Sequence, residues 1–133
     1  MNLDAIAAAW SPRLLSVLRI MSGLLFLQHG TAKHLKFPVV PMFAKLEPVS
    51  LLGAAGVIEI VGSLLLILGL FTRTTAFILS GFMAVAYFMS HAPRGLYPIL
   101  NGGELAVLYC FVFLFIAAAG PGPWSYDALQ KKR

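Results

Sequence analysis

The sequence predicts an all-α integral membrane protein in which four spans form an antiparallel four-helix bundle. The first observation is composition: 59% of the 133 residues are hydrophobic and 11% are charged, whereas soluble domains contain about 25% charged residues. A chain this short cannot bury so much apolar surface within itself, so much of it must face lipid. The second observation is that four apolar runs approach the length of a bilayer span. The length further indicates a single domain, residues 1–133.

Charge and cysteine content exclude two classes of protein. The formal net charge is +5, but Lys and Arg stand at the ends of the apolar runs, as headgroup anchors do, and form no patch that could bind nucleic acid. Cys110 is the single cysteine. It cannot form an internal disulfide or a cysteine metal site, which argues against a thiol-disulfide oxidoreductase.

The first span is expected at residues 14–32. At about 100° per residue, its small and ionisable residues fall within one arc of roughly 120° that should face protein. Ionisable side chains at membrane depth are costly, so each is a candidate functional residue. The arc continues one residue past the span and contains Arg19, Ser22, Gly23, Phe26, His29, Gly30 and Lys33.

The first loop, residues 33–48, contains three prolines, which preclude a long helix. It begins next to His29 and carries apolar residues between the prolines. Two interpretations are therefore open: a lid that folds back over a site, or an ordinary amphipathic connector on the membrane surface.

The second span is expected at residues 49–71, with Glu59 near its middle. Small residues share the face of Glu59 and should let a neighbouring helix approach closely; they are Ala55, Gly56, Gly62 and Ser63. Arg19 has a long side chain within reach of this face, so we predict a buried structural ion pair between Arg19 and Glu59.

The third and fourth spans are expected at residues 74–91 and 101–119. The connection before the third span is so short that spans two and three must be antiparallel neighbours. An inward stripe on the third span is expected to contain Phe77, Ser80, Ala84, Tyr87 and His91. The corresponding stripe on the fourth contains Asn101, Glu104, Leu108, Phe111 and Phe115.

Four spans place both termini on one side of the membrane. Five basic residues belong to that side (Arg13, Arg73, Lys131, Lys132 and Arg133), and four belong to the other (Lys33, Lys36, Lys45 and Arg94). The positive-inside rule therefore leans towards cytoplasmic termini.

Helix depth brings His29, His91 and Glu104 to one surface, with Glu59 deeper below it, which permits three hypotheses. In the first, these residues only pair and satisfy helix ends. In the second, they exchange protons with a small molecule such as a quinone headgroup, because histidine titrates near neutrality. In the third, His29 and His91 hold a haem or a metal. No CxxCH or HExxH spacing supports the third, so haem is disfavoured and no metal site is predicted.

Several motifs occur in a specific order along the chain. Arg19, Gly23, His29, Gly30 and Lys33 form R-x3-G-x5-HG-x2-K. Gly56, Glu59 and Gly62 then form G-x2-E-x2-G. The segments GLFTR (69–73), NGGELAVLY (101–109) and GPGPWSYD (120–127) follow. Along nearly its whole length the chain resembles the DoxX family of small four-span membrane proteins.

The resemblance implies a multi-pass protein of the bacterial cytoplasmic (inner) membrane. Some DoxX relatives are subunits linked to thiosulfate:quinone oxidoreduction, and others accompany membrane complexes that handle oxidative and sulfur stress. The family pattern carries over onto Arg19, His29, Lys33, Glu59, Asn101 and Glu104, whereas His91 is supported by its stripe and depth alone.

We therefore expect this protein to be a component of a membrane redox system with a polar intramembrane site. If the protein is catalytic, it is expected to be an oxidoreductase subunit. The ligand is a quinone or a small sulfur compound, and the partners are the lipid bilayer and a soluble redox or sulfur-transfer protein, with homo-oligomers also open. The alternative is a non-catalytic scaffold or binding subunit, or a small-solute carrier. The expected binding or proton-exchange residues are His29, Lys33, Glu59, His91, Asn101 and Glu104.

Overall fold

The computed structural model describes residues 2–133, and the regular structure among them is entirely helical. The long helices are α1 (Leu3–His34), α2 (Leu51–Leu68), α3 (Thr72–Ser90) and α5 (Glu104–Ala119). The short elements are η1 (Pro41–Phe43), η2 (Ala92–Arg94), α4 (Pro98–Asn101) and α6 (Tyr126–Gln130). The first three long helices are apolar and long enough to cross a membrane, and α5 is a shorter apolar helix. The predicted all-α membrane bundle is confirmed.

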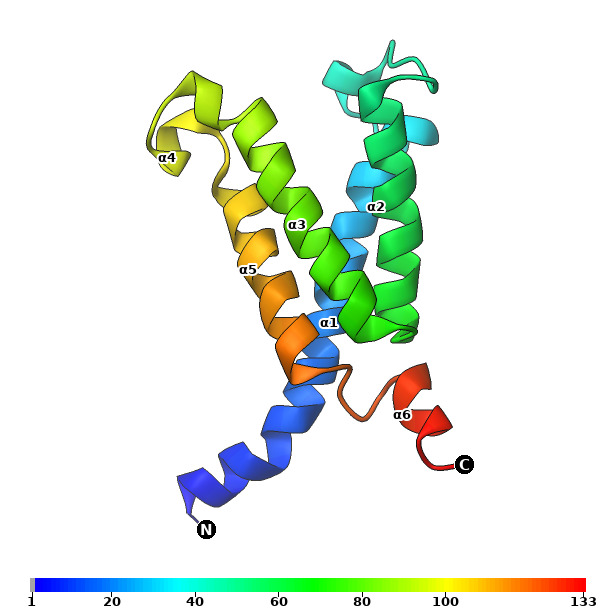
Figure 1. Ribbon diagram of the computed structural model, residues 1–133, viewed down its shortest axis with the longest axis vertical. Helices are drawn as coiled ribbons and strands as arrows, with labels where there is room; N and C mark the ends of the chain where they lie inside the picture. Colours follow the sequence, from blue (N-terminus) through cyan, green and yellow to red (C-terminus); the bar gives the residue numbers. More distant parts are fainter. Residues whose placement is uncertain (1) are drawn as a thin grey trace.

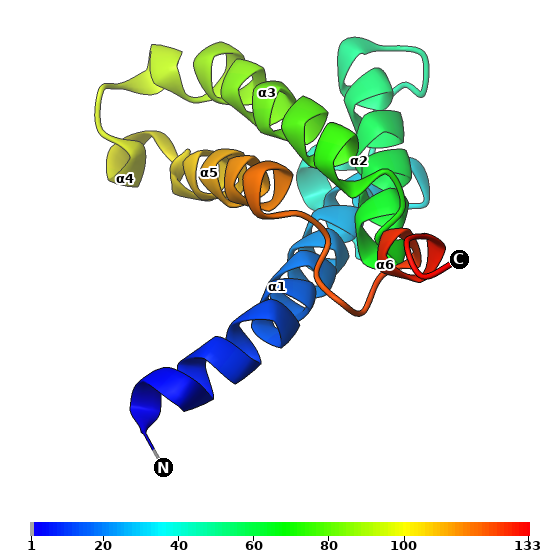
Figure 2. The same cartoon turned by 60° about the horizontal axis from the view of Figure 1, so that its bottom comes forward.

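The four long helices form two pairs. α1 packs along α2, and α3 packs along α5 (Figure 1). The two pairs lie close together at the end that carries both chain termini and diverge towards the opposite end (Figures 1 and 2). Apolar side chains buried between the pairs form the core, chiefly Phe26, Leu66, Leu79, Phe113 and Ile116.

Helix α1 begins at Leu3, well before residue 14, where the first span was expected to start. The Asn2 side chain caps it by accepting a hydrogen bond from the Asp4 N–H at 3.0 Å, and the helix continues through Pro12. At about 1.5 Å per residue, its 32 residues exceed the roughly 30 Å of a bilayer core. The N-terminal part therefore projects beyond the bundle (Figure 1).

Glycines set the contact between α1 and α2. A Cβ atom placed on Gly30 would lie 2.8 Å from the Gly56 carbonyl oxygen, and one on Gly23 would lie 3.3 Å from that of Ser63. Backbone approach of this kind is what small residues permit between membrane helices. The predicted small-residue face of α2 is confirmed, because Gly56, Gly62 and Ser63 are buried together with Glu59.

Arg19 ties three segments together at the end of the bundle near the termini. Its guanidinium is fully buried and donates from Nε to the Leu66 carbonyl (2.8 Å), from Nη2 to that of Trp124 (2.6 Å) and from Nη1 to that of Pro121. The Ser16 hydroxyl accepts from the Trp124 N–H at 3.1 Å. These bonds fasten the segment after α5 to α1 and to the end of α2.

The predicted ion pair between Arg19 and Glu59 is wrong, and the helix register explains why. The Arg19 Cζ lies 3.1 Å from where a Cβ on Gly69 would be, so Arg19 is level with the end of α2. Glu59 precedes Gly69 by ten residues, about 15 Å along a helix. Arg19 therefore bonds to backbone carbonyls at the helix ends.

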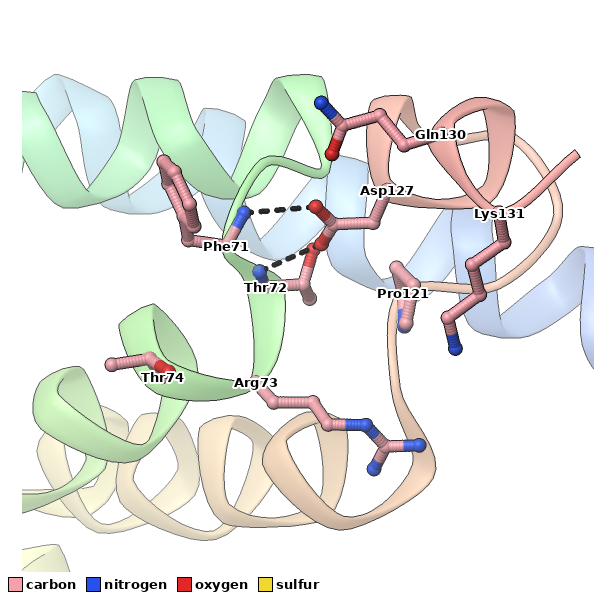
Figure 3. A pocket seen from close by; sticks show the side chains of 8 residues that line it. All are labelled: Phe71, Thr72, Arg73, Thr74, Pro121, Asp127, Gln130 and Lys131. Carbon is pink, nitrogen blue, oxygen red and sulfur yellow. Dashed lines mark hydrogen bonds between the residues drawn. The ribbon is translucent and has the colours of Figure 1, made fainter. Parts of the chain in front are cut away.

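Asp127 in α6 holds the turn between α2 and α3. Its carboxylate accepts the N–H groups of Phe71 (3.0 Å) and Thr72 (2.9 Å), and its own N–H donates to the Gly69 carbonyl at 2.9 Å (Figure 3). Burial raises the pKa of this carboxyl, but the hydrogen bonds from Thr72 and Phe71 and the charge of Arg19 outweigh it, so its pKa lies below the ordinary value.

Replacing Arg19 by Lys should strongly destabilise the bundle, because an ammonium cannot reproduce the fork that reaches three carbonyls. Hydrogen bonds from charged groups contribute about 1.5–3 kcal/mol each, so we expect the free energy of unfolding in mixed micelles to fall by at least about 3 kcal/mol. Arg13→Lys is the matched control, because Arg13 is exposed and bonds only within α1. Equal stability of the two variants would contradict this role.

The contribution of Asp127 to stability should disappear in acid. Its folded pKa is depressed, so the stabilisation is complete above the unfolded pKa of about 3.9 and is lost as the pH falls through the folded value. The thermal midpoint of Asp127→Asn should therefore lie below that of the wild type at pH 7 and approach it towards pH 3. The control, Asp4→Asn at the exposed start of α1, should show no such convergence. A gap for Asp127→Asn that is the same at every pH would count against the argument.

Candidate functional site

Lys33 and Glu59 form a buried ion pair near the end of α1 that adjoins the first loop. The Lys33 Nζ lies 2.8 Å from Oε2 and 3.0 Å from Oε1 of Glu59, and the two side chains are 6% and 9% exposed. Within residues 2–133 no other Lys or Arg pairs with a carboxylate at this range. The buried arc of α1 and the small-residue face of α2 meet here, so these two predicted site residues are brought together.

The first loop folds over this pair. The Lys33 ammonium lies 4.7 Å from the centre of the Phe43 ring, a cation–π distance. The Lys36 ammonium donates to the carbonyls of Lys33 (3.0 Å) and Phe43 (2.6 Å), which holds the loop against α1. The His34 Nε2 lies 2.6 Å from the Gly53 carbonyl oxygen. The loop therefore covers the ion pair, as a lid would.

His29 lies one helical turn before Lys33 and faces α5. Its ring is half-buried, with centroids 6.3 Å from the Phe26 ring and 6.2 Å from the Tyr109 ring. Lys33 makes a long contact of 3.4 Å with the His29 carbonyl. The imidazole itself has no hydrogen-bond partner in the part of the chain that the structure describes, so its nitrogens are free to bind a ligand.

Aromatic rings from three helices form a layer beside His29. Phe26 of α1 packs against Phe82 of α3 at 6.3 Å and against Tyr109 and Phe113 of α5 at 5.2 Å each. These rings fill the region where the two helix pairs meet. His29 follows Phe26 by one turn in the direction in which the pairs diverge (Figure 1). The half-buried imidazole therefore lies at the edge of a closely packed aromatic layer.

His91 and Asn101 belong to a separate cluster. The Asn101 side-chain amide donates to the Tyr87 hydroxyl (3.1 Å) and the Gly95 carbonyl (3.0 Å), and the backbone carbonyl oxygen of Asn101 lies 3.2 Å from the His91 Nδ1. Figures 1 and 2 show α4 and the start of α2 on opposite sides of the molecule. The predicted convergence of His91 with His29 and Glu59 is wrong; His91 and Asn101 close the connection between α3 and α5.

Glu104 is exposed, so the prediction that it faces the bundle interior is also wrong. That prediction assumed one unbroken helix from Asn101, but α4 ends there, Gly102 adopts φ 72°, and α5 starts anew at Glu104. Because the helix is interrupted at Gly102, a different face of α5 points into the bundle. The buried stripe of α5 is Ala106, Tyr109, Phe113 and Ile116.

His29 and His91 therefore do not face one another as a haem or metal pair would. No group of three or more His, Cys, Asp or Glu side chains in residues 2–133 is placed to hold a metal ion.

Three residues of the site were not predicted from the sequence. Tyr109 falls on the inward face if the helical periodicity is counted from Glu104, after the Gly-Gly pair, instead of from Asn101. His34 lies just beyond the expected first span, and Phe43 lies in a loop whose path no periodicity predicts. The site that the structure assembles thus comprises His29, His34, Lys33, Phe43, Glu59 and Tyr109.

Comparison with known proteins agrees with this architecture. The DoxX family profile matches residues 14–92. An uncharacterized protein of Haemophilus influenzae is 51% identical over 124 residues, which cover 89% of this chain and 91% of that protein. The inner membrane protein YqjF of Escherichia coli is 28% identical over 121 residues, 88% of this chain and 92% of that protein. No solved structure matches the chain.

Substituting either partner of the buried ion pair alone should strongly destabilise the protein. Lys33→Met or Glu59→Gln alone disrupts a buried charge pair, for which losses of about 3–5 kcal/mol are typical. The double variant should lose much less than the sum of the single losses, as measured by unfolding in mixed micelles. Lys45→Met and Glu47→Gln, both on the exposed part of the same loop, form the control cycle and should be additive. Additivity in the Lys33–Glu59 cycle would refute the coupling.

Proposed function

The chain belongs to the DoxX family of membrane proteins, and from that premise we propose that it is the membrane component of a redox system and binds a quinone headgroup beside His29. The observation that carries the proposal is the free imidazole at the edge of the aromatic layer, one turn from the buried Lys33–Glu59 pair. A quinone carries hydrogen-bond acceptors at the rim of its ring, and an imidazole without a protein partner can donate to one of them.

Different residues of the site make different interactions with the proposed quinone. The Phe26 and Tyr109 rings are buried and pack against the His29 ring, which holds the imidazole in place, and His29 donates a hydrogen bond to a quinone carbonyl. Reduction of a quinone to the quinol takes up two electrons and two protons. We assign the electrons to a soluble partner that oxidises a reduced sulfur compound. His29 delivers one proton to each carbonyl oxygen in turn and regains a proton from water after the first transfer, because histidine exchanges protons near neutral pH.

The family and the inner-membrane relative support a location in the bacterial cytoplasmic membrane. Both termini lie at one end of the molecule (Figure 1), and that end carries five of the nine basic residues outside the spans, Arg13, Arg73, Lys131, Lys132 and Arg133. By the positive-inside rule, this excess of one basic residue favours cytoplasmic termini. In this orientation the His29 site lies in the outer half of the membrane.

A second candidate is a non-catalytic binding subunit. The specific observation in its favour is that both carboxylate oxygens of Glu59 already accept from Lys33, at 3.0 and 2.8 Å, beneath the first loop. In this case the pair locks α1 to α2, and His29 binds the ligand without exchanging protons. The two candidates make different predictions for quinone reduction by the protein together with its soluble partner. The rate depends on proton exchange by His29 in the first candidate and does not in the second.

Binding of a quinone analogue to the purified protein in nanodiscs tests the proposal directly. His29→Ala should weaken binding about tenfold, because loss of a hydrogen bond in a dry site costs about 1.4 kcal/mol. Tyr109→Leu should also weaken binding, because it removes the ring that packs against His29. Glu104→Gln is the matched control and should bind like the wild type, because Glu104 is exposed at the start of α5. Absence of saturable binding, or equal affinity of His29→Ala and Glu104→Gln, would exclude the proposed site.

A further inference from the structure

A polar pocket lies at the end of the bundle near the chain termini. It has a volume of about 340 Å³ and is formed by the α2–α3 turn, the start of α3, the segment after α5, and α6 (Figure 3). None of its residues belongs to the His29 site. The lining residues that the argument uses are Phe71, Arg73, Thr74, Pro121, Asp127 and Lys131.

Two cations from different elements extend into this pocket. Figure 3 shows the side chains of Arg73, on α3, and Lys131, after α6, both reaching towards Pro121. Arg73 donates through Nη1 to the carbonyls of Ala117 (3.0 Å) and Ala118, which leaves the other guanidinium nitrogens free of protein partners in residues 2–133. The Lys131 ammonium has no hydrogen-bond partner in that same range. Neither cation is paired with a carboxylate of the described chain.

One carboxylate also lines the pocket, but it is already engaged. Asp127 accepts the Phe71 and Thr72 N–H groups at 3.0 and 2.9 Å. With Arg73 and Lys131 the formal charge of the lining is +1, and Lys132 and Arg133 follow directly in the sequence. The free donors and the excess positive charge favour an anion that several N–H groups can bind at once.

The surroundings place this anion at the membrane surface. The pocket lies where α3 begins and α5 ends, the level at which helices meet the headgroups. Phe71, which lines the pocket, is 68% exposed, and Leu129 of α6 is 61% exposed, so apolar surface adjoins the cations. We propose that the pocket binds a phosphate group, carried by the headgroup of an anionic phospholipid or by a small phosphate compound. Guanidinium and ammonium groups are the usual ligands of phosphate oxygens.

Lipid titration of the full-length protein in detergent tests this site. Phosphatidylglycerol should bind the wild type more tightly than phosphatidylcholine, as measured by native mass spectrometry. The double variant Arg73→Gln/Lys131→Gln should lose about fivefold in phosphatidylglycerol affinity for each cation removed, since one basic residue near a membrane surface contributes about 1 kcal/mol. The matched control Lys45→Gln/Arg94→Gln removes the same charge from exposed positions at the other end and should bind like the wild type.

Two further measurements complete this test: the lipid affinity of a single variant and competition by inorganic phosphate. Because Arg73 also caps the end of α5, Lys131→Gln alone is measured as well; its side chain makes no internal bond in residues 2–133, so the fold should be intact and affinity should fall about fivefold. Inorganic phosphate identifies the source: competition at millimolar concentration indicates a site for small phosphates, and lack of competition indicates a lipid headgroup. The proposal is overturned if Lys131→Gln and the control variant bind phosphatidylglycerol equally, or if the wild type shows no preference for it.

Discussion

The close contact between α1 and α2 decides which charges can meet inside this protein. Gly30 and Gly23 lie so near the backbone at Gly56 and Ser63 that sliding one helix along the other would bring a side chain into that contact. This register places Lys33 within reach of Glu59 and sends Arg19 to the end of α2. The polar chemistry of the bundle therefore depends on residues that have almost no side chain of their own.

The protein stabilises its two buried cations by different means. Lys33 is neutralised by a carboxylate, whereas Arg19 is surrounded by carbonyl dipoles from segments distant in the sequence. A guanidinium suits the second task because its donors form a rigid planar fork, and an ammonium suits the first because it is a compact charge. The Arg19 arrangement connects the ends of helices, and the Lys33–Glu59 arrangement lies beneath the loop beside His29.

Much of the fold followed from the sequence because the bilayer imposes strong rules. Apolar run length predicted the long helices, and the polar arc of α1 and the small face of α2 were found from helical periodicity. The partner of Arg19 could not be predicted, because periodicity gives the direction of a side chain and leaves the axial register between helices undetermined. The inward face of α5 was misassigned for a related reason: the turn at Gly102 interrupts the helical phase. Loop residues such as Phe43 have no periodic signal at all.

The divergence of the two helix pairs bears on how a ligand would reach His29. The pairs are fastened at one end by Arg19 and Asp127 and separate towards the other (Figure 1). The half-buried His29 ring of α1 lies beside Tyr109 of α5. A lipid-soluble molecule would enter sideways from the acyl chains, without crossing water. Occupancy of such a site follows the mole fraction of ligand dissolved in the bilayer, so the membrane acts as its reservoir.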